Sequence, residues 1–156
     1  MRRFVCLVIV LLLVETVGSP LPARAQAASD VNGGGTAAGP DTSSQFGMGI
    51  GIAGDGSVAG HFNCVMAGRS AMNGLSDMTV RGSVTHATIT PAGATFGGVG
   101  TLNMKSAQSS TRESMTVGFS VTVTPGGAGV GTLSLAVPDV AFAMTETITS
   151  GQVSIH

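Results

Sequence analysis

The sequence predicts an all-β domain, either a single antiparallel β-sandwich or a small β-barrel of about eight strands. Three observations predict this class. Apolar and polar residues alternate with a period of two in segment after segment, most clearly over residues 115–123. Turn sequences that contain Pro and Gly separate these segments, and no segment has a helical period of useful length.

Residues 26–46, which precede the first predicted strand, have the composition of a flexible linker. From Gln26 to Gln45 they contain one valine, Val31, among small, polar, Gly and Pro residues. Such a segment cannot bury enough apolar surface to offset the entropy lost on ordering it. We therefore expect a disordered tether over 26–46 and a folded domain over 47–156.

Two strands are expected at the start of this domain. The first has apolar residues at alternate positions between glycines, at Met48, Ile50 and Ile52. The second has four apolar residues on one face, at Val58, Phe62, Cys64 and Met66. His61 and Asn63 then lie on its other face, because successive side chains of a strand point to opposite sides.

The next two strands are expected near residues 78–84 and 96–104, on either side of a turn at Pro91-Ala92-Gly93. Their apolar positions are Met78, Val80 and Val84, then Phe96, Leu102 and Met104. His86 has the parity of Val84, so it either points inward or marks a bulge. The pair Gly97-Gly98 suggests a bulge or a close approach of two backbones.

The remaining strands are expected at 115–123, 133–137, 140–144 and 152–155, with turns at Pro125-Gly126-Gly127 and Pro138-Asp139. Short turns between consecutive strands indicate an antiparallel meander. Phenylalanines are expected mainly in the core, at Phe46, Phe62, Phe96, Phe119 and Phe142. A transmembrane barrel is disfavoured because the chain has no Trp or Tyr from which aromatic girdles could form.

Residues 1–25 have the three parts of a secretory signal peptide. Arg2 and Arg3 precede an apolar run over 4–14, and Ala23-Arg24-Ala25 provides a small-x-small cleavage site. The run is shorter than the roughly 20 residues that a spanning helix needs. We therefore expect cleavage near Ala25/Gln26, a secreted or periplasmic location, and no integral membrane segment in the mature chain.

The charge of the mature chain disfavours nucleic acid as a partner. Its basic residues are Arg69, Arg81, Lys105 and Arg112, against five Asp and two Glu residues, so the net charge is 4 − 7 = −3. A weakly acidic domain lacks the basic surface that phosphate backbones require.

Cys64 and the histidines are the candidate reactive groups. Cys64 is the one cysteine of the mature chain, so no intramolecular disulfide is expected, and its parity favours a buried apolar role over a reactive thiol. A secreted hydrolase would need a base, for which His61 and His86 are the candidates. The sequence has no G-x-S-x-G motif, identifies no catalytic residue, and so favours a non-enzymatic role.

Two glycine-rich motifs do not have the context that ligand binding requires. Residues 49–54 match the dinucleotide pattern G-x-G-x-x-G, but no helix is predicted after them. Residues 126–133 resemble a calcium-binding nonapeptide, with Gly131 where the ligating Asp belongs. We interpret both as strand and turn, and we expect no cofactor and no metal site.

The order of elements resembles bacterial exported β domains of the post-COAP type. The resemblance rests on GMGIGIAG at 47–54, GHFN at 60–63, ATFGGVGTLN at 94–103 and SGQVSIH at 150–156. It implies a small, exported, all-β domain without an established activity, and it supplies no catalytic residues.

Three functions follow as expectations. The first is a secreted or periplasmic, non-enzymatic domain that binds a cell-envelope or extracellular partner or has a structural role there. The second is a small secreted hydrolase with a histidine base. The third is a self-assembling surface protein, because strand edges can pair between chains.

Overall fold

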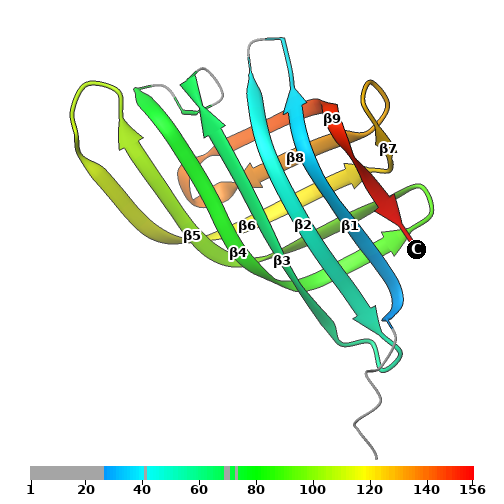
Figure 1. The fold of residues 1–156 in the computed structure, drawn as a ribbon. Helices are drawn as coiled ribbons and strands as arrows, with labels where there is room; N and C mark the ends of the chain where they lie inside the picture. Colours follow the sequence, from blue (N-terminus) through cyan, green and yellow to red (C-terminus); the bar gives the residue numbers. More distant parts are fainter. Residues whose placement is uncertain (1–26, 41, 69–70, 73) are drawn as a thin grey trace, which may run out of the picture.

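The computed structural model describes residues 27–40, 42–68, 71–72 and 74–156. The predicted signal peptide, residues 1–25, lies outside the described residues. Within the described ranges the chain forms nine strands and one short 3-10 helix (Figure 1). These are β1 (Ala27–Ala38), β2 (Ser43–Ala53), β3 (Val58–Ala67), β4 (Leu75–Thr90), β5 (Gly93–Ser106), β6 (Arg112–Thr124), β7 (Gly126–Gly127), β8 (Thr132–Val137), η2 (Pro138–Val140) and β9 (Phe142–Ile155).

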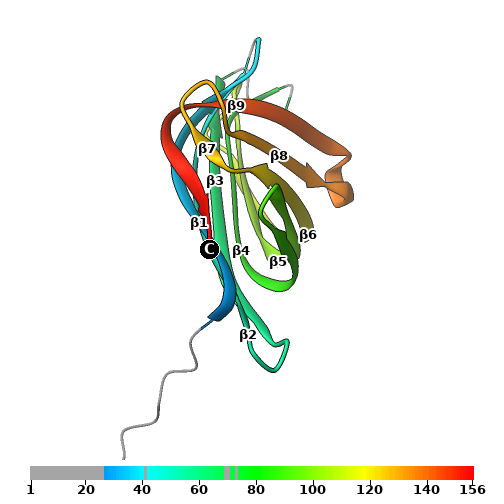
Figure 2. The same cartoon turned by 90° about the vertical axis from the view of Figure 1, so that its right-hand side faces the viewer.

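Eight of these strands form a closed antiparallel barrel, which decides between the two predicted architectures. Strands β1 to β6, β8 and β9 follow one another as a meander, and β9 pairs with β1 from Val31↔Ile155 to Ala38↔Thr147. The two-residue β7 is an additional strand that pairs with β9. Figure 2 shows β1 and β3 on one side of the interior and β5, β6 and β8 on the other.

The wall of the barrel is least complete beside the first half of β6. Strand β8 pairs with β6 only from Ser120 to Thr124, while β5 pairs with β6 along its whole length from Arg112. The helix η2 covers part of this stretch, because the Gly118 amide donates to Asp139 Oδ2 at 2.7 Å. Met115, which lies further from this contact, is 38% exposed.

Side chains from all eight barrel strands fill the interior. Phe62 is buried there, edge-to-face with Phe96 at 5.9 Å between ring centroids and stacked on Phe119 at 5.6 Å. Such pairs stabilise a core by about 0.5–1.5 kcal/mol beyond the area they bury. Phe46 is also buried and Phe142 is half-buried, so the expectation that phenylalanines form the core is confirmed.

The predicted disordered tether over 26–46 is wrong for most of its length. Residues 27–38 form β1, the strand that closes the barrel, and β2 begins at Ser43. Strand β1 places only the small apolar side chains of Val31 and Ala37 in the core, and its backbone pairs with β2 and β9 on either side. A Cβ on Gly35 would lie 2.0 Å from the Ser150 oxygen, so glycine is what allows β9 to approach.

The bulge expected near His86 and Gly97-Gly98 is confirmed. The register between β4 and β5 shifts between Val84↔Gly98 and His86↔Gly97, which leaves Thr85 as the extra residue. His86 is therefore exposed on the outer face, and the inward pattern resumes at Ala87 and Ile89.

The two strands expected at 140–144 and 152–155 are one strand, β9. Val140 belongs to η2 instead, and the strand begins at Phe142 after Ala141, which has a positive φ of 50°. A register shift against β1 leaves Thr149 unpaired, and Gly151 follows with φ 78°. This bulge interrupts the alternation, which is why the sequence pattern divides the strand in two.

Candidate functional site

Three methionines form a continuous row across the inside of the barrel. Met66 of β3 lies directly opposite Met78 of β4, and Met78 lies directly opposite Met104 of β5. Residues directly opposite in antiparallel strands project their side chains to the same face. Met66 and Met78 are fully buried, while Met104 is half-buried. We call Met66, Met78 and Met104 the methionine ladder.

The inner end of the methionine ladder meets a buried polar cluster. Ser44 of β2 lies opposite Met66, and its hydroxyl donates a hydrogen bond to Glu146 Oε2. Glu146 is 2% exposed, and its second oxygen, Oε1, has no hydrogen-bond partner. An unpaired buried polar group costs roughly 1–3 kcal/mol. We call Ser44, Cys64 and Glu146 the buried carboxyl cluster.

Cys64 is the third member of this cluster and lies two residues before Met66 on the same face of β3. Burial raises the pKa of the Cys64 thiol to about 12; the Ser44 hydroxyl opposes this shift and the nearby Glu146 charge adds to it. The thiol therefore stays protonated at neutral pH. The expected buried, unreactive role of Cys64 agrees with its burial.

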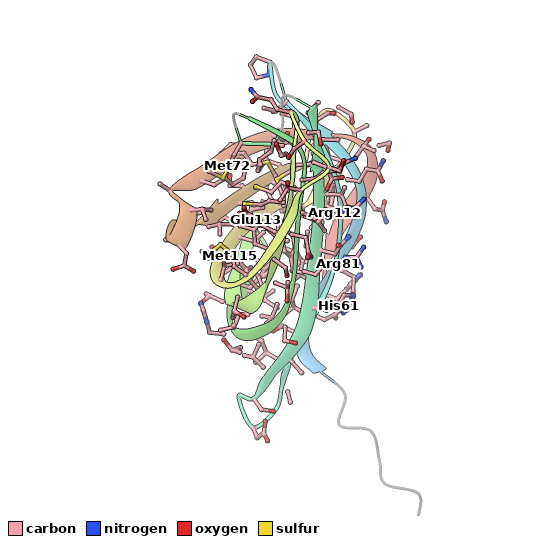
Figure 3. All side chains as sticks on the ribbon, turned by 90° about the vertical axis from the view of Figure 1, so that its left-hand side faces the viewer. His61, Met72, Arg81, Arg112, Glu113 and Met115 are labelled. Carbon is pink, nitrogen blue, oxygen red and sulfur yellow. The ribbon has the colours of Figure 1, made fainter. Side chains whose placement is uncertain are left out.

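The outer end of the methionine ladder opens into a pocket of about 250 Å3. Met104 lies opposite Glu113 of β6 there. The lining residues are Leu75, Met104, Ser106, Ser109, Thr111 and Glu113. In Figure 3, Glu113 lies on the same side as Met72 and Met115, away from His61 and Arg81. We call this cavity the rim pocket. Its floor consists of the half-buried Leu75 and Met104, and its other four lining residues, Glu113 among them, are polar.

The outer face of the same strands carries a row of opposite charges. Asp77, Lys105 and Arg112 are consecutive register partners on β4, β5 and β6. Together with Met104, Glu113 and two further residues, they line a cavity of about 150 Å3. Arg112 is exposed and Asp77 and Lys105 are half-buried, and by strand parity the three side chains project from the face opposite to the methionine ladder.

The two candidate histidine bases are both exposed on the outer face. His61 lies opposite Gly49 and Ser83, and His86 contacts Thr85 Oγ1 at 3.3 Å through Nδ1. Among the described residues, neither ring has a carboxylate as its hydrogen-bond partner. The structure therefore does not bring His61 or His86 together with the machinery of a hydrolase.

The carboxylates near turns have structural roles. Asp55 accepts a hydrogen bond from the Ser57 amide at 2.9 Å, and Ser57 holds the pKa of Asp55 below its usual value. This contact closes the turn between β2 and β3. Asp139 likewise fixes η2 against β6 through Gly118.

Both glycine-rich motifs have the structures expected of strand and turn. Residues 49–53 end β2 and a turn follows, without a helix. Residues 126–133 form β7, a turn and the start of β8. In the described ranges, no three His, Cys, Asp or Glu side chains lie close enough to hold a metal ion.

The fold is an eight-stranded meander barrel. Its methionine ladder has the buried carboxyl cluster at one end and the rim pocket at the other. No model of a known protein family matches the chain, and no match was found among curated proteins or among solved structures. Among the helices of the described residues, none has the length and apolar character needed to cross a membrane.

The sequence did not single out Glu146 or the ladder. A signal for Glu146 was present, because it has the same parity as Met144 and Ile148 in β9. The inward parity of each ladder methionine was also readable. That the three methionines are neighbours depends on the register between strands, which parity does not determine.

Proposed function

We propose that this chain is an exported, non-enzymatic binding domain, and that it binds a small, mainly apolar ligand in the rim pocket. The observation that carries the proposal is the pair of half-buried apolar side chains, Met104 and Leu75, in a pocket whose other four lining residues are polar. Ligand sites generally combine an apolar lining with a few polar groups. Methionine suits such a floor because its thioether adapts to different ligand shapes.

The pocket lies where the barrel wall is least complete. The first half of β6 pairs with β5 alone, and Met115 on this strand is partly exposed toward the same side as Glu113 (Figure 3). A ligand can therefore enter beside β6 without separating paired strands.

The two alternative functions have less support. Neither His61 nor His86 lies beside a carboxylate or in a pocket that the structure describes, which weighs against a histidine-based hydrolase. Pairing of β1 with β9 leaves neither of these two strands as a free sheet edge, and this weighs against self-assembly through them. The resemblance to exported post-COAP-type domains agrees with a non-enzymatic role and stays a hypothesis.

Titration with the neutral fluorescent probe N-phenyl-1-naphthylamine tests binding in the rim pocket. We expect saturable binding of one probe per chain. Met104→Gln keeps the length of the side chain but makes the floor polar, so we expect binding to weaken by roughly tenfold. The matched control is Val99→Thr, at an outer-face residue of β5 that is 56% exposed, and it should leave binding unchanged.

Two results would contradict the proposal. One is the absence of saturable probe binding, or equal weakening by Met104→Gln and Val99→Thr. The other is turnover of generic ester, peptide or glycan substrates that His61→Ala or His86→Ala abolishes, which would favour the hydrolase.

A further inference from the structure

The buried carboxyl cluster contains a charge-bearing group that the fold itself leaves incompletely paired. Glu146 is 2% exposed, and only its Oε2 atom has a partner, the Ser44 hydroxyl. Buried carboxylates are normally paired with a cation or with several hydrogen-bond donors. The unpartnered Oε1 therefore points to a ligand that the chain does not supply.

Soft donors follow on the strands beyond Ser44, the residue that donates to Glu146. Met66 lies opposite Ser44, which holds Glu146, and Met78 lies opposite Met66. Cys64, two residues from Met66, adds a buried thiol. Thioether and thiol sulfur select Cu(I) and similar soft ions, whereas Mg²⁺ and Ca²⁺ require oxygen ligands.

The charge of the cluster favours a monovalent ion. A single positive charge beside the Glu146 carboxylate brings the buried site to neutrality, because thioethers are neutral ligands. A divalent ion would leave an excess positive charge in the core. No cluster of three His, Cys, Asp or Glu side chains suited to zinc occurs in the part of the chain that the structure describes.

We propose that the inner end of the methionine ladder binds a soft monovalent metal ion, Cu(I) or Ag(I), through the thioethers of Met66 and Met78 and the carboxylate of Glu146. This site is distinct from the rim pocket and does not depend on the apolar ligand proposed for it.

The ladder also supplies a path for the ion from solvent. Glu113, at the edge of the rim pocket, lies opposite Met104, and Met104 lies opposite the buried Met78. An ion can pass from the surface carboxylate to Met104 and then to Met78 and Met66 by exchanging one thioether for the next. If the methionines only filled the core, the carboxylates of Glu113 and Glu146 at the two ends of the row would have no role.

Metal titration of the full mature chain tests the proposal, with Ag(I) added as silver nitrate in chloride-free buffer. Cu(I), kept reduced without oxygen, is measured by competition with bicinchoninate. We expect native mass spectrometry to show one ion per chain and no comparable binding of Zn(II). Glu146→Gln, Met66→Leu and Met78→Leu should each weaken binding roughly tenfold or more.

These substitutions conserve volume, so we expect each variant to keep the fold. The matched control is Met48→Leu, a buried methionine opposite Phe62 and four residues from Ser44 along β2, which should leave affinity unchanged. If a variant unfolds, the methionine methyl NMR signals of the unsubstituted protein test the site instead. Silver should shift those of Met66 and Met78 but not that of Met48.

The proposal is wrong if silver does not bind at one ion per chain. It is also wrong if Cys64→Ala abolishes binding while Glu146→Gln, Met66→Leu and Met78→Leu do not, because the ion would then be captured by the thiol alone. Equal affinity for Zn(II) would exclude a soft site.

Discussion

At the scale of single residues, the barrel interior keeps the Cys64 thiol protonated far above neutral pH. Burial raises its pKa from the usual 9.0 to about 12. Between these two values the unfolded chain has lost the proton and the folded chain still holds it. Because the unfolded state then binds fewer protons, the free energy of unfolding decreases as the pH rises.

We therefore expect stability that is independent of Cys64 below about pH 9 and falls above it by roughly 1.4 kcal/mol per pH unit. Urea unfolding at pH 8, 9 and 10 measures the effect. Cys64→Ala supplies the reference, since it removes this titration and keeps every other ionisable group. Parallel losses of stability in both proteins between pH 8 and 10 would show that the thiol is not responsible.

The glycines of the strands differ in how much space a Cβ atom would have at their positions. A Cβ on Gly98 would lie 2.0 Å from the Ser83 oxygen at the bulge of β4 and β5, whereas a Cβ on Gly47 would meet no atom within 4 Å. We expect Gly98→Ala to destabilise the barrel by more than about 2 kcal/mol, because backbone must move.

Gly47→Ala is the matched change and should stabilise the protein by about 0.5 kcal/mol, because alanine loses less backbone entropy on folding. Chemical denaturation of the two variants checks both signs. Similar stabilities for Gly98→Ala and the unsubstituted protein would mean that the two strands are further apart at the bulge.

At the scale of elements, β1 explains where prediction from the sequence succeeds and where it does not. Strands such as β6 are readable because Val117, Phe119 and Val121 alternate with polar residues. Strand β1 has Gly33 and Gly35 at positions between the buried Val31 and Ala37, so its alternation carries almost no apolar signal. Its stability comes from pairing with β2 and β9, which a local pattern does not contain.

The inclusion of β1 in the barrel gives a direct prediction about Val31, which is fully buried. Val31→Asp places an unpaired charge in the core and should destabilise the protein by more than about 4 kcal/mol or prevent folding. Asn32→Ser, at the next, outward-facing residue, should change stability by less than about 0.5 kcal/mol.

Circular dichroism and thermal unfolding of the two variants measure the difference. If the Val31→Asp protein is as stable as the Asn32→Ser protein, residues 27–38 are a flexible tether rather than a barrel strand, because a tether tolerates a charge at any position.

At the scale of the whole molecule, closure of the barrel brings distant residues into one site. The predicted number of about eight barrel strands is correct, but two errors offset each other: the sequence pattern does not reveal β1, and it divides β9 into two strands. The candidate site could not be predicted from the sequence for the same reason. Ser44 and Glu146 belong to β2 and β9, which lie on either side of the unpredicted strand β1. Only a sheet that closes through β1 brings Glu146 to Ser44, the residue that lies opposite Met66 of the methionine ladder.

The start of β1 also lies close to the expected cleavage site of the signal peptide. With β1 beginning at Ala27, cleavage between Ala25 and Gln26 would leave a single residue before the first strand. Near the start of this strand, Asp30 exchanges two backbone hydrogen bonds of 2.9 Å with His156, the last residue of the sequence.

We accordingly expect intact-mass measurement of the protein recovered from the periplasm or the medium to give a chain that begins at Gln26. Replacing Ala25 by Phe should block cleavage and leave the protein cell-associated, because the peptidase requires a small residue before the cut. Arg24→Gln is the control, since the residue between the two alanines is not constrained in size. Exported protein that still begins at Met1, or equal processing of Ala25→Phe and Arg24→Gln, would overturn the assignment of residues 1–25 as a cleaved signal.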